Sequence, residues 1–198
     1  MKVTHLLISF SVALSVYAWN SSDNLSFNSS TIFHYTLLTA LFVHANIVHL
    51  LGNIAFLYVF GSMLEDEIGA FRITILFFVG GVLSFILSIP FYPDASMVGA
   101  SAAIFALMAT LLLVRRPTVS IQFLSPIGPM VILFFIFNIL AVHSSEKTNI
   151  AYVSHVIGFV IGLCFGMRWN PEWKKSLLYT LILLGIYVVL YNYIRQWF

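Results

Sequence analysis

Seven long stretches of apolar residues, separated by short polar segments, run along the chain. To within several residues they cover 4–19, 46–63, 73–91, 100–114, 128–143, 150–168 and 176–194. The hydrocarbon core of a bilayer, about 30 Å thick, is crossed by about 20 helical residues at a rise of 1.5 Å each. Segments rich in Ser and Asn, or containing Pro, separate the stretches. The pattern predicts an all-α polytopic membrane protein.

The composition supports this fold class. Apolar residues make up 61% of the 198 residues and charged residues only 8%, against about 25% charged in an average globular protein. So few charges cannot cover a water-soluble surface, which excludes a soluble enzyme and a disordered chain. The net charge of +2 gives no basis for binding nucleic acid, and a single cysteine, Cys164, excludes a disulfide framework.

Lys and Arg in the short loops predict how the chain is oriented in the membrane. If the N-terminus is cytoplasmic, seven of these residues fall inside and two outside. Those inside are Lys2, Arg72, Arg115, Arg116, Arg168, Lys174 and Lys175, and those outside are Lys147 and Arg195. We therefore expect an integral multi-pass protein whose odd-numbered stretches run from inside to outside.

The first stretch leaves two alternatives open. Lys2, the apolar run and the small-residue end at 16–18 suit either a membrane span or a signal peptide with its cleavage site. Both alternatives leave residues 20–45 outside. That loop holds three Asn-x-Ser acceptors, which matter only in a cell that glycosylates: Asn20, Asn24 and Asn28.

Polar side chains inside the predicted spans are few, and inside a membrane such residues face the bundle interior and mark function. They are His49 and Asn53 in the second stretch, Ser101 in the fourth and His155 in the sixth. These three stretches run in the same direction, and the helix rise puts all four residues within about 11 Å of the outer surface. No Asp or Glu lies mid-span, which argues against an intramembrane aspartyl protease, a His-Glu-x-x-His zinc protease and a carboxylate proton relay.

Small residues predict that the fourth and sixth stretches pack closely. One stripe of the sixth stretch, at 100° per residue, contains His155, Gly158, Gly162 and Gly166. The fourth stretch offers a matching surface of small residues, namely Gly99, Ala102, Ala103, Ala106 and Ala109. Close approach of the two helices would bring the His155 imidazole to the Ser101 hydroxyl.

This pairing would supply a nucleophile and a base. His155 would accept the Ser101 proton, an acyl-enzyme would form, and His155 would then protonate the leaving amine. His49, Asn53 and the backbone amide of Ser101 would donate hydrogen bonds to the oxyanion. Because no buried Asp orients His155, the expected arrangement is a dyad.

Each of these residues, taken singly, also has a structural interpretation. A serine among small residues packs helices, a lone histidine can be a structural hydrogen-bonding group, and Gly-x-x-x-Gly is a helix contact. His44, five residues before His49, suits a structural role at the helix entry, a substrate-side role or a catalytic role equally well. His5, His34 and His143 lie near predicted loops, and we expect no metal site from them. The shared depth and matching faces favour catalysis.

Four motifs, taken in order, resemble those of the rhomboid intramembrane serine proteases and cover about residues 33–166. The second stretch contains His44-Ala-Asn-Ile-Val-His49-Leu-Leu-Gly-Asn53 and then Gly61-Ser-Met-Leu-Glu65-Asp-Glu-Ile-Gly69. The fourth contains Gly99-Ala100-Ser101-Ala102, which is similar to the family's Gly-x-Ser-x motif. The sixth contains His155-Val-Ile-Gly158-Phe-Val-Ile-Gly162, which is similar to its His-x-x-Gly-x-x-x-Gly helix.

The resemblance implies a six-helix core over residues 1–170 and a seventh transmembrane helix over 171–198. It implies a serine endopeptidase that cleaves single-pass membrane proteins near the outer end of their transmembrane helix, without a cofactor. Carried over by position, Ser101 and His155 are catalytic, and His49, Asn53 and the Ser101 amide form the oxyanion site. The remaining motif residues would be substrate-side or structural (His44, Gly99, Phe105) or would pack helices (Gly158, Gly162).

Two positions depart from the family pattern. Tyr35 and Thr36 stand where a Trp-Arg pair is common, which puts the anchoring of the first loop in doubt. Phe105 replaces a frequent Tyr and can still stack on His155.

A non-proteolytic rhomboid-like protein that binds membrane clients is the alternative function. A small transporter would need an internal repeat and a polar path through the full membrane. The expected partners are a transmembrane substrate and the lipid bilayer; the sequence does not reveal the oligomeric state.

Overall fold

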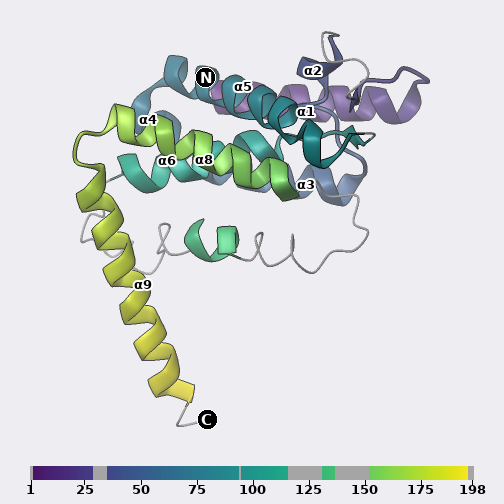
Figure 1. Ribbon diagram of the computed structural model, residues 1–198. Coiled ribbons are helices and arrows are strands. Elements are labelled where there is room, and N and C mark those ends of the chain that lie inside the picture. Colours follow the sequence, from purple (N-terminus) through teal and green to yellow (C-terminus); the bar gives the residue numbers. More distant parts are fainter. Residues whose placement is uncertain (1, 29–34, 94, 116–130, 137–151, 196–198) are drawn as a thin grey trace.

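The computed structural model describes residues 2–28, 35–93, 95–115, 131–136 and 152–195, which are mainly helical (Figure 1). The α-helices are α1 (Val3–Asn20), α2 (Thr36–Thr39), α3 (Ile47–Phe56), α4 (Ser62–Ile68), α5 (Ala70–Ser88), α6 (Ser101–Val114), α8 (Tyr152–Trp169) and α9 (Trp173–Arg195). A π-helical segment, η2 (Leu57–Gly61), joins α3 to α4, and a 3-10 turn, η3 (Ile89–Phe91), ends α5. Residues 131–136 are also helical.

Four helical stretches are long and apolar enough to cross a bilayer, namely Val3–Asn20, Ile47–Ile68, Ala70–Phe91 and Tyr152–Trp169. They correspond to the first, second, third and sixth predicted stretches. The second runs five residues beyond its predicted end at 63, because η2 and α4 continue α3. The fourth, α6, has 14 residues and is short, as its apolar stretch predicts. The fifth falls largely outside the described residues, so the count of six helices plus one stays a prediction.

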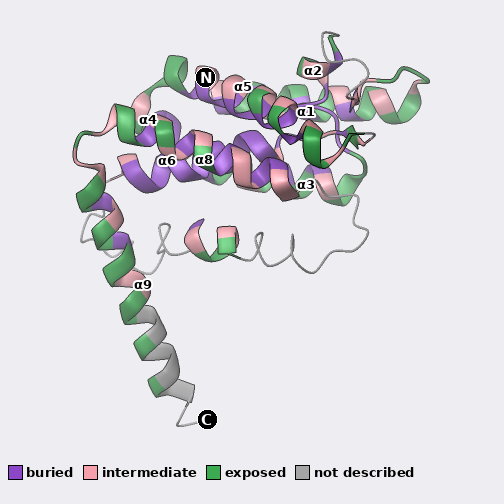
Figure 2. Ribbon diagram, viewed as in Figure 1, coloured by how far each residue is buried: buried purple, intermediate pink, exposed green. Residues whose placement is uncertain are grey.

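Helix α6 lies at the centre of the bundle and is buried from Ala102 to Leu113 (Figure 2). Glycines of α5 and α8 face it at very short range. A Cβ atom at Gly80 would lie 2.7 Å from Cβ of Ala106, and one at Gly162 would lie 2.2 Å from the Ala106 carbonyl oxygen. Because both glycines lack a side chain, the two neighbouring backbones can approach α6 directly, which is how small residues hold helices together in lipid.

Helix α9 extends away from the other helices (Figure 1). Its start is tied to the bundle through Asn170, whose Nδ2 donates a hydrogen bond of 2.6 Å to the Leu113 carbonyl at the end of α6. Further along α9, Leu178 and Ile182 are exposed. The helix is therefore anchored at one end only within the described part of the chain.

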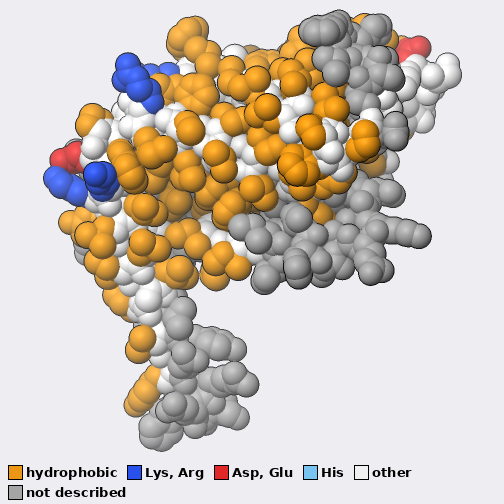
Figure 3. All heavy atoms as spheres, in the orientation of Figure 1, with side chains coloured by type: hydrophobic (Ala, Val, Ile, Leu, Met, Phe, Trp, Pro, Cys, Tyr) orange, Lys and Arg blue, Asp and Glu red, His pale blue; other side chains and the backbone are white. Residues whose placement is uncertain are grey.

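Apolar side chains also cover much of the outer surface (Figure 3). Phe71 is 78% exposed and Val48 is 77% exposed. A soluble monomer rarely exposes large contiguous apolar patches, whereas lipid tails are as apolar as these side chains. This surface agrees with an integral membrane protein.

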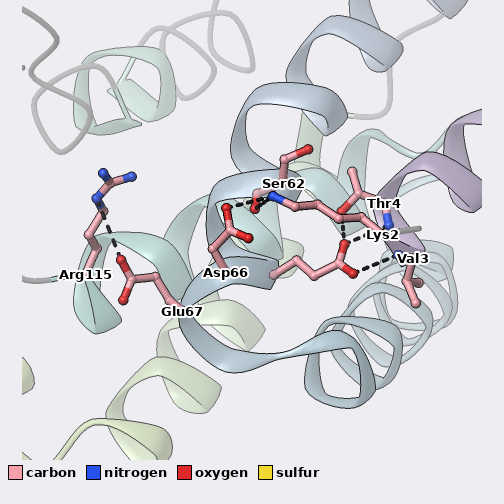
Figure 4. Close-up of polar contacts among 8 residues, drawn as sticks. Lys2, Val3, Thr4, Ser62, Asp66, Glu67 and Arg115 are labelled. Atoms are coloured by element: carbon pink, nitrogen blue, oxygen red, sulfur yellow. Dashed lines mark hydrogen bonds and ion pairs between the residues drawn. The ribbon is translucent and has the colours of Figure 1, made fainter.

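A buried carboxylate of α4 forms hydrogen bonds with the N-terminus of α1 (Figure 4). Glu65 accepts hydrogen bonds from the Val3 and Thr4 amides at 2.7 and 2.9 Å and from the Thr4 hydroxyl at 2.6 Å. It thereby satisfies N–H groups that the first turn of a helix leaves unpaired. Lys2 adds an ion pair to Asp66 at 2.7 Å. The sequence places Glu65 at a span end, and the longer second stretch puts it inside α4.

A short antiparallel pair of strands joins two loops that the sequence does not connect. Strand β1 (Phe27–Asn28) pairs with β2 (Ser96–Met97), so that Phe27 lies opposite Met97. The Phe27 ring is fully buried and stacks on Phe85 with centroids 5.7 Å apart. This pairing holds the segment that leads into Ser101 against the end of α5.

Candidate active site

The structure brings together the serine and the histidine that the sequence singles out. Ser101 is the first residue of α6, and His155 lies in the first turn of α8. Nε2 of His155 lies 2.7 Å from Oγ of Ser101, within hydrogen-bond distance. His155 is buried, whereas Ser101 is partly exposed.

Close contact between the two helix starts makes this distance possible. A Cβ atom at Gly158 would lie 2.2 Å from the Ala102 carbonyl oxygen and 3.0 Å from its carbonyl carbon. Any other residue at Gly158 would push α8 away from α6, because the opposing atoms belong to backbone. Gly158 lies three residues after His155, so the contact that it allows sets the height at which the imidazole meets Ser101.

An aromatic side chain covers one face of the imidazole. Phe105, one turn after Ser101, stacks on His155 with ring centroids 4.8 Å apart and planes at 13°. Phe134, from the helical segment 131–136, stacks on Phe105 at 5.3 Å. The stacking that the sequence allows for Phe105 is present, and it restricts rotation of the His155 ring.

His49 lies against the segment that precedes Ser101. Gly99 has a positive φ of 110°, and a Cβ atom there would lie 2.9 Å from Cε1 and 3.0 Å from Nε2 of His49. The Gly99 amide donates a hydrogen bond of 2.8 Å to the Ala40 carbonyl. Glycine therefore serves two purposes at this position: it adopts a backbone conformation that side chains disfavour, and it leaves room for the His49 imidazole.

Asn53 lies one turn after His49 and is almost fully buried. Its Nδ2 donates a hydrogen bond of 2.9 Å to the His49 carbonyl, which leaves a second N–H of the amide for another acceptor. Its Oδ1 is buried and has no hydrogen-bond partner among the described residues. A buried amide with capacity left over suits a site that binds a polar group.

His44 is a buried residue of the loop between α2 and α3. Its Nδ1 lies 3.1 Å from both the Phe42 carbonyl and Oγ of Ser15. Its ring meets the edge of His49 with centroids 5.1 Å apart. Its Nε2 is buried and has no hydrogen-bond partner among the described residues. The roles that the sequence leaves open for His44 therefore stay predictions.

Sequence reasoning missed the part of α1 that holds this loop. Ser15 donates a hydrogen bond of 3.1 Å to the Phe42 carbonyl, and Trp19 Nε1 donates one of 2.8 Å to the His44 carbonyl. The sequence does contain a pattern that predicts a buried polar face on α1. Thr4, Ser11 and Ser15 recur at helical spacing within this apolar helix, and all three are buried.

Several other sequence candidates lie elsewhere. His5 is exposed and stacks on Tyr58 at 6.0 Å. His34 and His143 lie outside the described residues. Tyr35 is 56% exposed, whereas Thr36 is buried. Within the described ranges, no group of three or more His, Cys, Asp or Glu side chains is arranged to hold a metal ion.

These features define a polytopic helical membrane protein with a serine and a histidine paired between two of its helices. Residues 33–172 match the family model of the Rhomboid domain, which covers more than half of the chain. The chain belongs to the rhomboid family.

The relatives of this chain include one that is named a protease and one that is named inactive. The chain is 30% identical to RHOMBOID-like protein 2 of Arabidopsis thaliana over 72% of its own length and 45% of that protein. It is 30% identical to the rhomboid protease GluP of Bacillus subtilis (strain 168) over 78% of its length and 30% of that protein. It is also 30% identical to inactive rhomboid protein 2 of Homo sapiens, over 69% of its length and 16% of that protein. The chain thus spans less than half of the length of each of these relatives.

Proposed function

We propose that this rhomboid-family chain is an intramembrane serine endopeptidase that cleaves single-pass membrane proteins in or near the outer end of their transmembrane helix. The observation that carries the proposal is the distance of 2.7 Å between Nε2 of His155 and Oγ of Ser101. The relative from Bacillus subtilis that is named a rhomboid protease supports the same activity.

In the proposed reaction, Oγ of Ser101 attacks the scissile carbonyl carbon while neutral Nε2 of His155 takes the hydroxyl proton. The tetrahedral intermediate collapses as the imidazolium gives that proton to the leaving amine. A water molecule then attacks the acyl-enzyme with His155 again as base, and the hydroxyl of Ser101 is restored. Phe105 keeps the imidazole in the plane that this shuttle needs.

The oxyanion of the tetrahedral intermediate would be stabilised from two sides. His49 lies against Gly99, two residues before Ser101, and Asn53 has a spare amide N–H. The backbone amide of Ser101 belongs to the first turn of α6, where N–H groups have no partner within the helix. Donors preorganised in a site shielded from water stabilise developing charge strongly.

A substrate helix must unwind locally before attack, because its backbone carbonyls are bonded within the helix in lipid. We therefore propose substrates with Gly, Ala or Pro near the outer membrane boundary. The proposal includes a cytoplasmic N-terminus, a site facing the extracytoplasmic side, a catalytic core over residues 1–170 and an added transmembrane helix over 171–198. The bias of seven Lys and Arg against two supports this orientation.

The decisive experiment incubates the purified chain, in bilayers, with such a single-pass substrate. Ser101→Ala and His155→Ala should each reduce cleavage by at least about a thousandfold, because the dyad acts as one unit. Ser9→Ala and His5→Ala are matched controls on the exposed side of α1 and should cleave at the wild-type rate. Wild-type turnover by either dyad variant would remove the proposed mechanism.

The oxyanion site has a separate test. His49→Ala and Asn53→Ala should each lower kcat by about a hundredfold with a smaller change in KM, because the lost hydrogen bond forms in the transition state. Val48→Ala, on an exposed position of the same helix, is the control. A change in KM alone would instead assign these side chains to substrate binding.

A client-binding protein without protease activity is the second candidate, favoured by the relative that is named an inactive rhomboid. A serine-directed fluorophosphonate distinguishes the two, since a binding protein needs no activated serine. Labelling that disappears in Ser101→Ala supports the protease. An unlabelled wild-type chain that still retains membrane clients supports the binding protein.

A further inference from the structure

Basic and aromatic side chains meet where α5 begins, α8 ends and α9 begins. On the face shown in Figure 3, the Lys and Arg side chains gather at this end of the molecule. Arg72, Arg168 and Lys174, which lie in or beside these helix ends, are exposed. We call these three residues, together with Trp169 and Trp173, the basic–aromatic cluster.

The aromatic rings of the cluster connect its charges to the apolar core. The Arg72 guanidinium lies 5.7 Å from the centre of the Trp169 ring, and the Lys174 ammonium lies 5.7 Å from that of Trp173. Both tryptophans are partly buried and pack on the hydrophobic core. Tryptophan with one apolar and one polar side is typical of the level of the lipid headgroups.

The cations of the cluster have no acidic partner among the described residues, whereas the other cations whose side chains the structure describes form ion pairs. Lys2 pairs with Asp66 at 2.7 Å, Lys175 with Glu172 at 2.7 Å and Arg115 with Glu67 at 3.9 Å. Arg72, Arg168 and Lys174 form no ion pair with any residue in the described part of the chain. The acidic side chains at this end, Glu67 and Glu172, are each already paired. The cluster is therefore a positive surface with unused charge.

The turn between α8 and α9, which separates Arg168 from Lys174, is fixed by hydrogen bonds of Asn170. Asn170 donates from Nδ2 to the Leu113 carbonyl at 2.6 Å, and its Oδ1 accepts a hydrogen bond of 3.0 Å from the Glu172 amide. Arg168 and Lys174 lie on either side of this turn. Because the turn is fixed to the end of α6, binding of a ligand beside these cations leaves little backbone to order.

We propose that the basic–aromatic cluster binds the headgroup phosphate of an anionic phospholipid. A lipid fits better than a free phosphate because exposed apolar side chains adjoin the charges: Phe71, next to Arg72, is 78% exposed, and Leu178, one turn beyond Lys174, is 57% exposed. These side chains offer contact to acyl chains, while the cations face the headgroup layer. Basic residues at the ends of transmembrane helices attract anionic lipids in this way.

Binding can be measured with brominated lipids that quench tryptophan fluorescence at short range. The full chain in non-ionic detergent is titrated with brominated phosphatidylglycerol or brominated phosphatidylcholine. Phosphatidylglycerol should quench at a mole fraction about tenfold lower. Arg72→Gln and Arg168→Gln should each weaken the preference about fivefold, and the double variant should remove it. The control Lys175→Gln should keep it, because that ammonium is already paired.

Three results would overturn the proposal: equal quenching by the two lipids, an unchanged preference in the double variant, or loss of the preference when glycerol phosphate competes, which would indicate a site for soluble phosphate. Since the double variant could also fail by misfolding, Arg72→Lys with Arg168→Lys provides a second test. This variant keeps both charges and should keep the preference. Loss of the preference in a variant that remains folded by circular dichroism would contradict a site based on charge.

Discussion

Helices α6 and α9 are both apolar and regular, yet their surroundings are opposite. Leu107 in α6 is fully buried, whereas Leu178 in α9 is 57% exposed. Hydrophobicity does not separate the two helices, because in a bilayer an apolar side chain is solvated equally well by lipid. Burial follows the small residues instead, because α6 packs on glycines of α5 and α8. The one glycine of α9, Gly185, meets no other helix among the described residues within 4 Å of where its Cβ would be.

The comparison teaches where a membrane protein can build a site. The serine and the histidine occupy the interface between α6 and α8, in which backbones nearly touch. Such an interface has few alternative arrangements, so it can hold two side chains to within hydrogen-bond distance. A helix that meets mostly lipid offers no comparable precision.

The largest effect should come from replacing a glycine of the tight interface. Gly158→Leu should reduce the free energy of unfolding by about 3 kcal/mol and abolish cleavage, since the new side chain meets the Ala102 backbone and separates His155 from Ser101. Gly185→Leu, into open space on α9, should change neither quantity. Stability can be measured by unfolding in a titration with sodium dodecyl sulfate. If Gly158→Leu and Gly185→Leu were equally stable and equally active, close packing on glycine would not explain the difference between α6 and α9.

A smaller effect is expected from a cavity beside a buried residue of α6. Leu107→Ala should cost about 2 kcal/mol, because the vacated volume loses its packing contacts. Leu178→Ala should stay within about 0.5 kcal/mol, since lipid fills the space at an exposed position. The same unfolding titration compares the two variants. A matching loss at Leu178 would reveal a protein partner for α9 instead of lipid.

The smallest effect concerns a single hydrogen bond between helices. Thr110 Oγ1 donates to the Gly162 carbonyl at 2.8 Å, whereas Thr180 Oγ1 bonds within α9 to the Ser176 carbonyl at 3.0 Å. Thr110→Val should lower the free energy of unfolding by about 0.6 kcal/mol. Thr180→Val should have no measurable effect, because no contact between helices is lost. Several repeats are needed to resolve this difference.

Periodicity and length predict much of the helical framework. The first, second, third, fourth, sixth and seventh stretches appear as helices. Gly158 and Gly162 do face Ala102 and Ala106 of α6, whereas Gly166 meets larger side chains. The meeting of Ser101 with His155 could be anticipated for the same reason: depth follows from the helix rise, and the facing side follows from the glycines. Both quantities are local properties of a helix.

The loop and strand contacts around the site join segments that are far apart in the sequence, and the sequence predicts such contacts poorly. The loop that holds His44 is fixed by Ser15 and Trp19 of α1, and β1 pairs with β2 across about seventy positions of sequence. Glu65 caps a helix sixty residues earlier. Backbone carbonyls and amides supply at least one partner in most of these interactions, and residue type says little about them. Residue types alone therefore cannot identify the partners.

By itself, the sequence determined that this is an integral membrane protein and along which of the described stretches it is helical, and it predicts the depth at which its few polar side chains lie. Apolar length and rise per residue are enough for those conclusions. Only the tertiary structure decided how helices without a stripe of small residues are rotated, and which loop supports the site. His49 lies against Gly99, whose amide bonds to the Ala40 carbonyl on a different segment. The physical reason is that lipid solvates every apolar face alike, so rotation and lateral order depend on close contacts that exist only after the helices have packed.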